Sequence, residues 1–255
     1  QGRHPDPGKL PAGSGDWPFA LQLNRHAYNL VAPEYQEDYF SDPATAAQFD
    51  SWLQGLPAGG QVLDAGCGHG DPVIARLLER GFQVTGIDLS PEMLRRAQER
   101  FPSVPFHNLA VTQLDREAAF DGACSLSSML YLDPIDFFHA IYRLYRALKP
   151  GGLLFLFGMD THPGWRGHPF DQVLEQWMWA WTRSLPEAVS ALEEHGYFRV
   201  LQAVEVTPPK EEEPDQPASS GPGEAIVQNI LSLPDSTIPF QLPPLPKPKR
   251  TQAYA

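Results

Sequence analysis

Short apolar runs alternate with stretches of helical spacing through the middle of the chain. The runs that predict buried strands are residues 61–65, 83–88, 104–108, 120–126 and 153–158. Three pairs of a polar residue followed by proline predict the starts of helices, because the polar side chain caps the helix and proline suits its first position. These pairs are Asp71-Pro72, Ser90-Pro91 and Asp133-Pro134. The regular order of strand and helix predicts an α/β fold with a doubly wound, mostly parallel sheet.

The residues before the first predicted strand follow a different pattern. Residues 1–16 are rich in glycine, proline and charge, and we expect a flexible tail or a remnant of cloning. Over residues 17–58 apolar side chains recur at helical spacing, interrupted by Pro33 and Pro43, so we expect short helices that form an N-terminal lid. Residues 59–255 are expected to form the main domain.

Beyond the fifth predicted strand the pattern becomes less regular. Residues 170–181 have helical spacing, with Trp177 and Trp181 on one face, and residues 186–195 predict another helix. These tryptophans are expected either to pack on the domain or to line a ligand pocket. Strands are predicted at residues 197–206 and 251–255, and the proline-rich residues 207–248 between them are expected to form a late insertion.

Composition restricts the partners of this chain. Its 255 residues carry a formal net charge of −12, which argues against nucleic acid or an anionic membrane surface as the main partner, since both attract basic proteins. No run approaches the ~20 apolar residues of a membrane span. Two cysteines, Cys67 and Cys124, are too few for a disulfide framework, so we expect a cytoplasmic protein. No cluster has the spacing of metal ligands, and no metal site is predicted.

The run from Val62 to Gly70, VLDAGCGHG, is the strongest chemical signal in the sequence. There a predicted strand leads through a glycine-rich turn into a helix, and glycine lets a ligand approach the backbone closely. Asp88 ends the second predicted strand at about the distance, ~20 residues, where an acidic side chain accepts hydrogen bonds from ribose hydroxyls. Together these features predict a nucleoside-type ligand at the carboxyl end of a parallel sheet.

Acidic side chains around the loop indicate which kind of nucleoside ligand the protein binds. Asp64 precedes the loop and Asp71 follows it, and both would repel a pyrophosphate at the helix N-terminus. The glycine spacing, G-x-G-x-G, also departs from the dinucleotide pattern G-x-G-x-x-G. S-adenosylmethionine lacks phosphate and carries a sulfonium and an ammonium group, which suit nearby carboxylates. Two simpler interpretations stay open: the glycines could form only a tight turn, and Asp64 could cap it.

Four motifs in order resemble those of class I S-adenosylmethionine-dependent methyltransferases, and a lead-in resembles their small-molecule branch. The motifs are residues 64–70, 86–94, 120–122 and 148–155, and the lead-in is residues 28–35. The resemblance implies a Rossmann-like sheet of seven strands, one of them antiparallel. It also implies S-adenosylmethionine as cofactor, S-adenosylhomocysteine as product and a small-molecule methyl acceptor.

The resemblance implies which residues hold the two ends of the cofactor. Asp64, Gly66, Cys67 and Gly68 would face the methionine end, mostly through their backbone, and Leu126 and Ser127 would close it. Tyr35 is a further expected contact with the cofactor. Tyr28 and Tyr35 lie at helical spacing, however, so core packing and ligand contact are equally open for both. Asp88 would bind the ribose hydroxyls, and Leu89 would lie against the adenine. The family often has a polar residue after the third strand that contacts the adenine amino group. This chain has Ala110 and Val111 there, so we expect the backbone of Val111 to serve instead.

The loop after the fifth predicted strand contains candidate bases for catalysis. Active sites of open α/β sheets lie beyond the carboxyl ends of the strands, where His162 or His168 could remove a proton from an acceptor. The alternative is an ordinary solvated loop, because Pro163 and Gly164 are typical of one.

Three classes of function therefore remain open. The first is methyl transfer by in-line displacement. The second is a non-catalytic protein or partner subunit that binds S-adenosylmethionine or S-adenosylhomocysteine. The third, an oxidoreductase that uses NAD, is disfavoured by the glycine spacing and the acidic loop. The acceptor, its reacting atom and the oligomeric state are not determined by the sequence.

Overall fold

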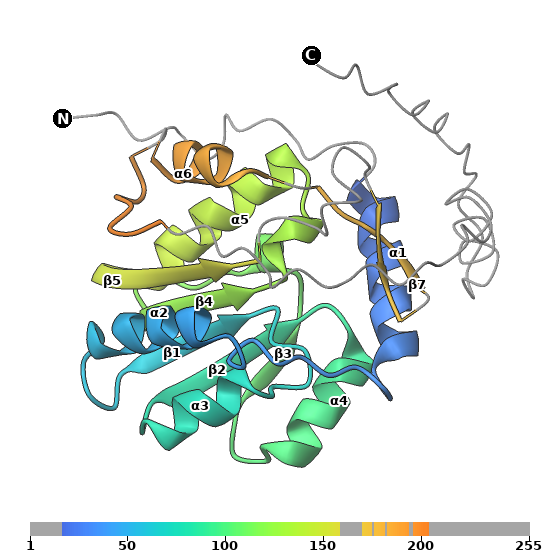
Figure 1. Ribbon diagram of the computed structural model, residues 1–255, viewed down its shortest axis with the longest axis horizontal. Helices are drawn as coiled ribbons and strands as arrows, with labels where there is room; N and C mark the ends of the chain where they lie inside the picture. Colours follow the sequence, from blue (N-terminus) through green and yellow to red (C-terminus); the bar gives the residue numbers. More distant parts are fainter. Residues whose placement is uncertain (1–16, 159–169, 175, 182, 194–195, 204–255) are drawn as a thin grey trace.

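The central element of the protein is a parallel sheet. The computed structural model describes residues 17–158, 170–174, 176–181, 183–193 and 196–203. Its five-stranded sheet has the order β3-β2-β1-β4-β5 (Figure 1). The strands are β1 (Gln61–Ala65), β2 (Gln83–Asp88), β3 (Phe106–Asn108), β4 (Phe120–Leu126) and β5 (Leu148–Phe157), and every neighbouring pair is parallel. The strand order reverses between β1 and β4, which is where open α/β sheets bind ligands.

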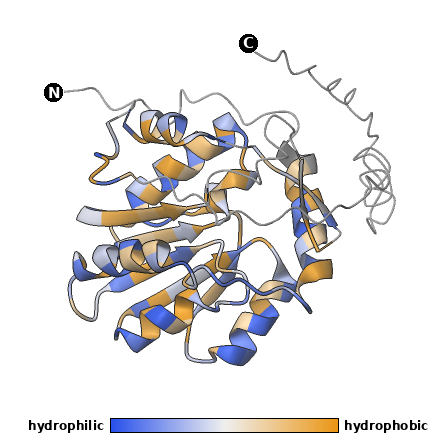
Figure 2. Cartoon of the chain, viewed as in Figure 1, coloured by the Kyte–Doolittle hydropathy of each residue, from blue (hydrophilic) through white to orange (hydrophobic). Residues whose placement is uncertain are grey.

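Each face of the sheet has its own apolar core, because successive strand residues point to opposite faces. Val62 and Cys124 pack on the face covered by α2 (Pro43–Gln54) and α3 (Val73–Glu79). Leu63 and Ala123 pack on the other face, covered by α5 (Pro134–Ala147), with α6 (Leu185–Glu193) beside it. Figure 2 shows the central strands as largely apolar and the helices as mixed. This layered arrangement confirms the predicted α/β fold.

Two of the three predicted helix caps are confirmed. Ser90 Oγ accepts a hydrogen bond from the Met93 N–H (3.1 Å) at the start of α4 (Pro91–Arg100). Asp133 caps α5 in the same way. The third prediction is wrong, because α3 begins at Val73 and Asp71 makes no cap. The Asp71 carboxylate instead forms an ion pair with Arg100 of α4 (2.8 Å), a tertiary contact that removes it from the helix end.

Residues 170–181 do not form the predicted helix. They form an antiparallel hairpin of β6 (Phe170–Val173) and β7 (Gln176–Trp179). The buried side chain of Asn24 in α1 (Trp17–Val31) explains the difference. Its amide donates to the Trp179 carbonyl (2.9 Å) and accepts from the Trp179 N–H (2.7 Å). This pair of bonds satisfies strand backbone that a helix would have bonded internally.

The predicted strand at residues 197–206 is not present in the part that the structure describes, residues 197–203. Tyr197 is instead buried against Tyr142 and Tyr145 of α5, with ring centroids 5.5 and 4.9 Å away. The predicted last strand, residues 251–255, and the insertion at 207–248 lie outside the described residues. A count of seven strands in the main sheet is therefore not confirmed.

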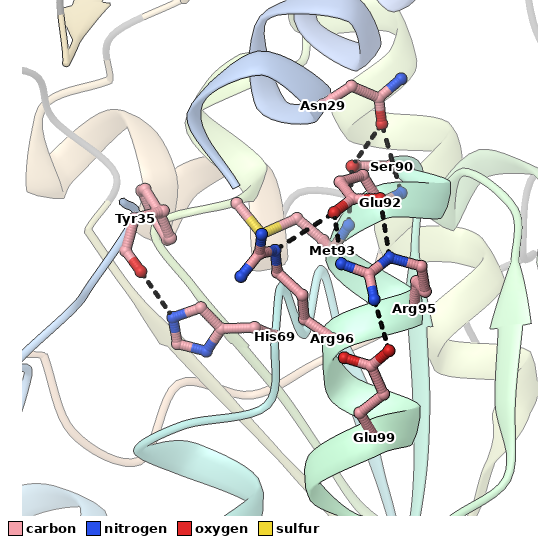
Figure 3. Close-up of polar contacts among 9 residues, drawn as sticks. All are labelled: Asn29, Tyr35, His69, Ser90, Glu92, Met93, Arg95, Arg96 and Glu99. Atoms are coloured by element: carbon pink, nitrogen blue, oxygen red, sulfur yellow. Dashed lines mark hydrogen bonds and ion pairs between the residues drawn. The ribbon is translucent and has the colours of Figure 1, made fainter. Parts of the chain in front are cut away.

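The segment predicted as a lid contains two helices with different surroundings. α2 packs directly on the sheet through Phe49 and Trp52. α1 packs instead against β7 and α4, and lies at the right of the sheet in Figure 1. Asn29 Oδ1 joins α1 to the start of α4, because it accepts hydrogen bonds from Ser90 Oγ (2.7 Å) and the Glu92 N–H (3.3 Å) (Figure 3).

Replacing Ser90 with alanine is expected to lower the free energy of unfolding. The change removes the cap of α4 and the partly buried hydrogen bond to Asn29, which together stabilise the fold by about 1–3 kcal/mol. Chemical denaturation followed by circular dichroism measures the loss. Ser103→Ala, at an exposed position, is the matched control. An equal effect of both substitutions would contradict the role of this cap.

Candidate functional site

A cavity lies at the carboxyl ends of β1, β2 and β4, next to the reversal of strand order. Its lining includes every residue predicted to bind the cofactor: Tyr35, Asp64, Gly66, Cys67, Gly68, Asp88, Leu89, Val111, Leu126 and Ser127. α1 and the 3₁₀ turn η3 (Met129–Tyr131) also contribute residues. The fold therefore brings the predicted set together in one place, and the individual contacts of these residues with a ligand remain a prediction.

The glycine loop is held against β2 by its backbone. The N–H groups of Gly66 and Cys67 both donate to the Ile87 carbonyl (2.8 and 3.0 Å). Gly66 has φ +84°, and a Cβ added there would lie 2.0 Å from Ser128 Oγ, so only glycine fits. A Cβ added at Gly68, by contrast, would meet no atom of the described residues within 4 Å. The loop thus packs tightly on one side and leaves room for a ligand on the other.

Asp88 is oriented by the backbone on both sides of its carboxylate. Oδ2 accepts from the Gly68 N–H (2.9 Å) and Oδ1 from the Ser90 N–H (2.7 Å). Burial raises the pKa of Asp88, while these hydrogen bonds act in the opposite direction. Each carboxylate oxygen can accept a second hydrogen bond, so the group retains capacity for two hydroxyl donors.

Asn108 supports the same corner of the site and was missed by the sequence analysis. Its amide nitrogen donates to the carbonyls of Asp88 (2.9 Å) and Leu89 (2.8 Å). Asn108 is the last residue of β3, so its place at the carboxyl end of a strand was a signal that could have identified it. Two residues after Asn108, the Ala110 N–H donates a hydrogen bond to Gln113 Oε1 (3.0 Å), so this backbone group already has a partner.

Asp64 is a buried carboxylate without a full set of hydrogen bonds. Its Oδ2 has no hydrogen-bond partner among the residues that the structure describes, and Oδ1 accepts only a long hydrogen bond from the Cys124 thiol (3.8 Å). Burial, with a smaller contribution from the negative charge of Asp88, raises the pKa of Asp64 to about 7. A buried, unpartnered carboxylate oxygen is costly, and a cationic group in the cavity would offset that cost. The site therefore fits the ammonium group of a methionine moiety.

His69 joins the glycine loop to the loop before α2 and was not singled out by the sequence analysis. Its Nδ1 accepts from the Asp71 N–H (3.2 Å), so Nε2 carries the proton that is donated to the Tyr35 carbonyl (3.0 Å) (Figure 3). Burial lowers the pKa of His69, which favours this neutral form. The two hydrogen bonds of the ring hold the backbone of Tyr35 next to the glycine loop, and so position Tyr35 at the cavity.

Aromatic side chains form a further wall of the cavity. It is lined by Tyr28, Tyr35, Tyr39 and Tyr131, and Glu37 lies among them. For Tyr28 and Tyr35 the sequence left core packing and ligand contact equally open, and the structure places both at the cavity. Trp181 does not line it: its side chain is 41% exposed, and its N–H donates to the Leu130 carbonyl (2.7 Å).

The predicted catalytic residues, His162 and His168, lie outside the described residues. Among the residues that are described, no group of three or more histidine, cysteine and acidic side chains could hold a metal ion. The helices of the described part are all too short or too polar to cross a membrane.

The sequence of this chain is similar to those of known methyltransferases and of a related enzyme. A family model described as a methyltransferase domain matches residues 62–152. The 2-methyl-6-phytyl-1,4-hydroquinone methyltransferase of Synechocystis is 28% identical over 170 residues, which are 63% of this chain and 53% of that protein. An S-adenosyl-L-methionine-dependent Diels-Alderase of Talaromyces variabilis is 29% identical over 168 residues, 57% of this chain and 56% of that protein. The chain spans about half the length of the curated relatives it matches.

A solved structure shows the same fold. The 1,6-didemethyltoxoflavin-N1-methyltransferase of Burkholderia thailandensis, crystallised with 1,6-didemethyltoxoflavin and S-adenosylhomocysteine, is 25% identical with a TM-score of 0.53. The match covers 72% of this chain and 80% of that one.

Proposed function

We propose that this chain, whose core is a class I S-adenosylmethionine-dependent methyltransferase domain, transfers the methyl group of S-adenosylmethionine to a small-molecule acceptor. The observation that carries the proposal is the pair of carboxylates in one cavity at the carboxyl ends of β1 and β2. Asp64 has an unpartnered oxygen suited to an ammonium group, and Asp88 is oriented for ribose hydroxyls.

The predicted contacts divide the cavity into two ends under this proposal. Asp64 and the glycine loop would hold the methionine part, with Leu126 and Ser127 closing it from β4. Asp88 would hold the ribose. Leu89 and Val111 would enclose the adenine, with Asn108 fixing the backbone beside it. The open space beside Gly68 supports this placement, since the backbone there can approach a ligand closely.

The reaction would be an in-line displacement at the methyl carbon. S-adenosylmethionine supplies an activated methyl group, and S-adenosylhomocysteine leaves. The contribution of the chain is to align the acceptor with the methyl carbon and to keep water out, which accounts for much of the rate in such reactions. Tyr28 of α1 and Tyr131 of η3 enclose the cavity, which favours a small acceptor. The two methyltransferases compared above are named for a 2-methyl-6-phytyl-1,4-hydroquinone and for 1,6-didemethyltoxoflavin, which are small molecules and not macromolecules.

One experiment separates this function from its alternatives. The purified protein is titrated with S-adenosylmethionine, S-adenosylhomocysteine and NADH, and is then incubated with S-adenosylmethionine and a panel of small acceptors. Micromolar binding of both sulfur compounds, with S-adenosylhomocysteine and a methylated product formed together, would support methyl transfer. Binding without product would favour a non-catalytic protein, or chemistry such as that named for the Diels-Alderase relative. Binding of NADH alone would refute the proposal.

Binding of S-adenosylhomocysteine is expected to release a proton from Asp64. The pKa of about 7 in the free protein falls when the ligand ammonium lies beside the carboxylate. A proton therefore binds Asp64 more tightly in the free protein than in the complex. As a result, the affinity for S-adenosylhomocysteine drops by up to about tenfold per pH unit below pH 7. The other titratable groups that lie near Asp64 are Asp88 and the thiols of Cys67 and Cys124. Burial raises the pKa of each of these three groups above its ordinary value.

Calorimetry at pH 8, 7 and 6, in two buffers with different protonation enthalpies, measures this proton release directly. Asp64→Asn should bind S-adenosylhomocysteine less tightly at pH 8 and should lose the pH dependence. A wild-type protein with equal affinity at pH 8 and pH 6 would show that Asp64 does not face the ligand ammonium.

A further inference from the structure

Three tyrosine rings of the cavity wall lie next to one another. The ring of Tyr28 lies edge-on to those of Tyr35 and Tyr131, with centroids 5.6 Å apart in both pairs. Its hydroxyl donates to Tyr131 (2.8 Å), which fixes the two rings relative to each other. The faces of aromatic rings carry partial negative charge, and several of them around one space favour an ammonium group.

Glu37 adds a carboxylate to this wall. The Tyr35 hydroxyl donates to its Oε1, and Tyr39 lines the same cavity. Burial raises the pKa of Glu37, while the neighbouring hydroxyls of Tyr35 and Tyr39 act in the opposite direction. Within the part of the chain that the structure describes, no lysine or arginine lines this cavity. Glu37 therefore has hydroxyl donors beside it but no cation within the cavity.

The neighbouring charges are already matched. Glu37 also borders a second cavity that contains Arg96 and Arg100. Arg96 pairs with Glu92 (3.2 Å) and Arg100 with Asp71 (2.8 Å). Asp64 and Asp88 have proposed partners in the cofactor. Glu37 is thus the carboxylate of the cavity for which the cofactor and the ion pairs leave no cationic partner.

Glu37 is connected to the end of the cavity where the methyl group would lie. Glu37, Tyr39 and Ser127 line the same cavity, and the Tyr39 hydroxyl lies near enough to both of the other side chains to influence their electrostatics. Ser127 follows β4 and is predicted to close the methionine end. The carboxylate of Glu37 therefore lies in the same cavity as a residue beside the methionine moiety, with Tyr39 as a common neighbour.

We propose that the methyl acceptor is an amine, which binds as an ammonium ion against Glu37 within the tyrosine wall and gives its proton to that carboxylate. This inference rests on the proposed function and names its substrate class. An ammonium nitrogen has no lone pair and cannot attack the methyl carbon. Transfer of one N–H proton to Glu37 leaves a neutral amine and a neutral carboxylic acid.

The remaining steps balance without any other reactant. The amine lone pair forms the N–CH₃ bond while the S–CH₃ bond breaks, and the electron pair of that bond stays on sulfur. The positive charge moves from the sulfonium to the methylated ammonium. Prior loss of the proton also prevents two cations from meeting in a cavity of low dielectric, where their repulsion would be strong. Glu37 is therefore assigned both recognition of the acceptor and removal of its proton.

Three probes of similar shape test the charge that this subsite prefers. Protein saturated with S-adenosylhomocysteine is titrated with benzylamine, benzyl alcohol and phenylacetate at pH 7.5. We expect benzylamine to bind at least about tenfold more tightly than benzyl alcohol, and phenylacetate to bind more weakly than both. Equal binding of the three probes, or no binding of benzylamine, would overturn the inference.

Two matched variants locate the preference. Glu37→Gln should abolish the advantage of benzylamine over benzyl alcohol and should leave the affinity for S-adenosylhomocysteine within about threefold of wild type. Glu34→Gln makes the same charge change three residues earlier, at an exposed position outside the cavity, and should retain the preference. A preference that persists in Glu37→Gln would overturn the assignment. If the wild-type protein does not bind S-adenosylhomocysteine at all, that result would instead refute the proposed function itself.

Discussion

Replacing Asp88 with alanine is expected to weaken the binding of S-adenosylhomocysteine by at least about a hundredfold. The substitution removes two charge-assisted hydrogen bonds to the ribose, each of which stabilises the complex by roughly 1.5–3 kcal/mol. It also removes the acceptors for the N–H groups of Gly68 and Ser90, which orient the glycine loop and the start of α4. Isothermal titration calorimetry measures the affinity directly.

Asp121→Ala is the matched control for this experiment. Asp121 also lies on a sheet strand and accepts from a backbone N–H, that of Gln61 (2.8 Å), while it pairs with Lys149 (2.9 Å). It lies at the start of β4, whereas the cavity lies at the carboxyl ends of the strands. Asp121→Ala should lower thermal stability and leave S-adenosylhomocysteine binding intact. Unchanged affinity in Asp88→Ala would remove Asp88 from the ribose site.

Replacing Gly66 with alanine is expected to have the second large effect. The new Cβ would lie 2.0 Å from Ser128 Oγ and 2.4 Å from Ser128 Cβ, so Ser128 must move. The positive φ of +84° adds about 1–2 kcal/mol of backbone strain, and the overpacking adds about 1–3 kcal/mol. Because Ser128 lines the cavity, displacing it should also weaken S-adenosylhomocysteine binding.

Gly81→Ala separates the backbone strain from the clash. Gly81 has nearly the same φ, +80°, and a Cβ there would lie more than 4 Å from every other atom in the part of the chain that the structure describes. Chemical denaturation should therefore show a loss of only about 1–2 kcal/mol for Gly81→Ala and a clearly larger one for Gly66→Ala. The double variant Gly66→Ala/Ser128→Gly should recover part of the difference. Equal losses for the two single variants would contradict the clash.

The predicted elements that the structure confirms are those determined by local physics. The apolar run at residues 61–65 became β1 because a strand buried on both faces needs little beyond that run. Ser90 and Asp133 cap α4 and α5 because an N-cap bond joins residues two or three positions apart. The predicted cofactor residues also lie together, because parallel strands place their carboxyl ends at one edge of the sheet.

What the sequence by itself determined was therefore the α/β order, most of the helix and strand positions, and the edge of the sheet where the glycine loop and Asp88 meet. Only the tertiary structure decided the partners across long separations. Asn24 bonds the backbone of Trp179 and so stabilises a hairpin where the apolar spacing predicted a helix. Asp71 forms an ion pair with Arg100 of α4 and does not cap α3. Glu37 reaches the cavity only because the loop before α2 folds onto Ser127 and the glycine loop. Such contacts depend on where distant side chains meet in space, and no local spacing encodes that.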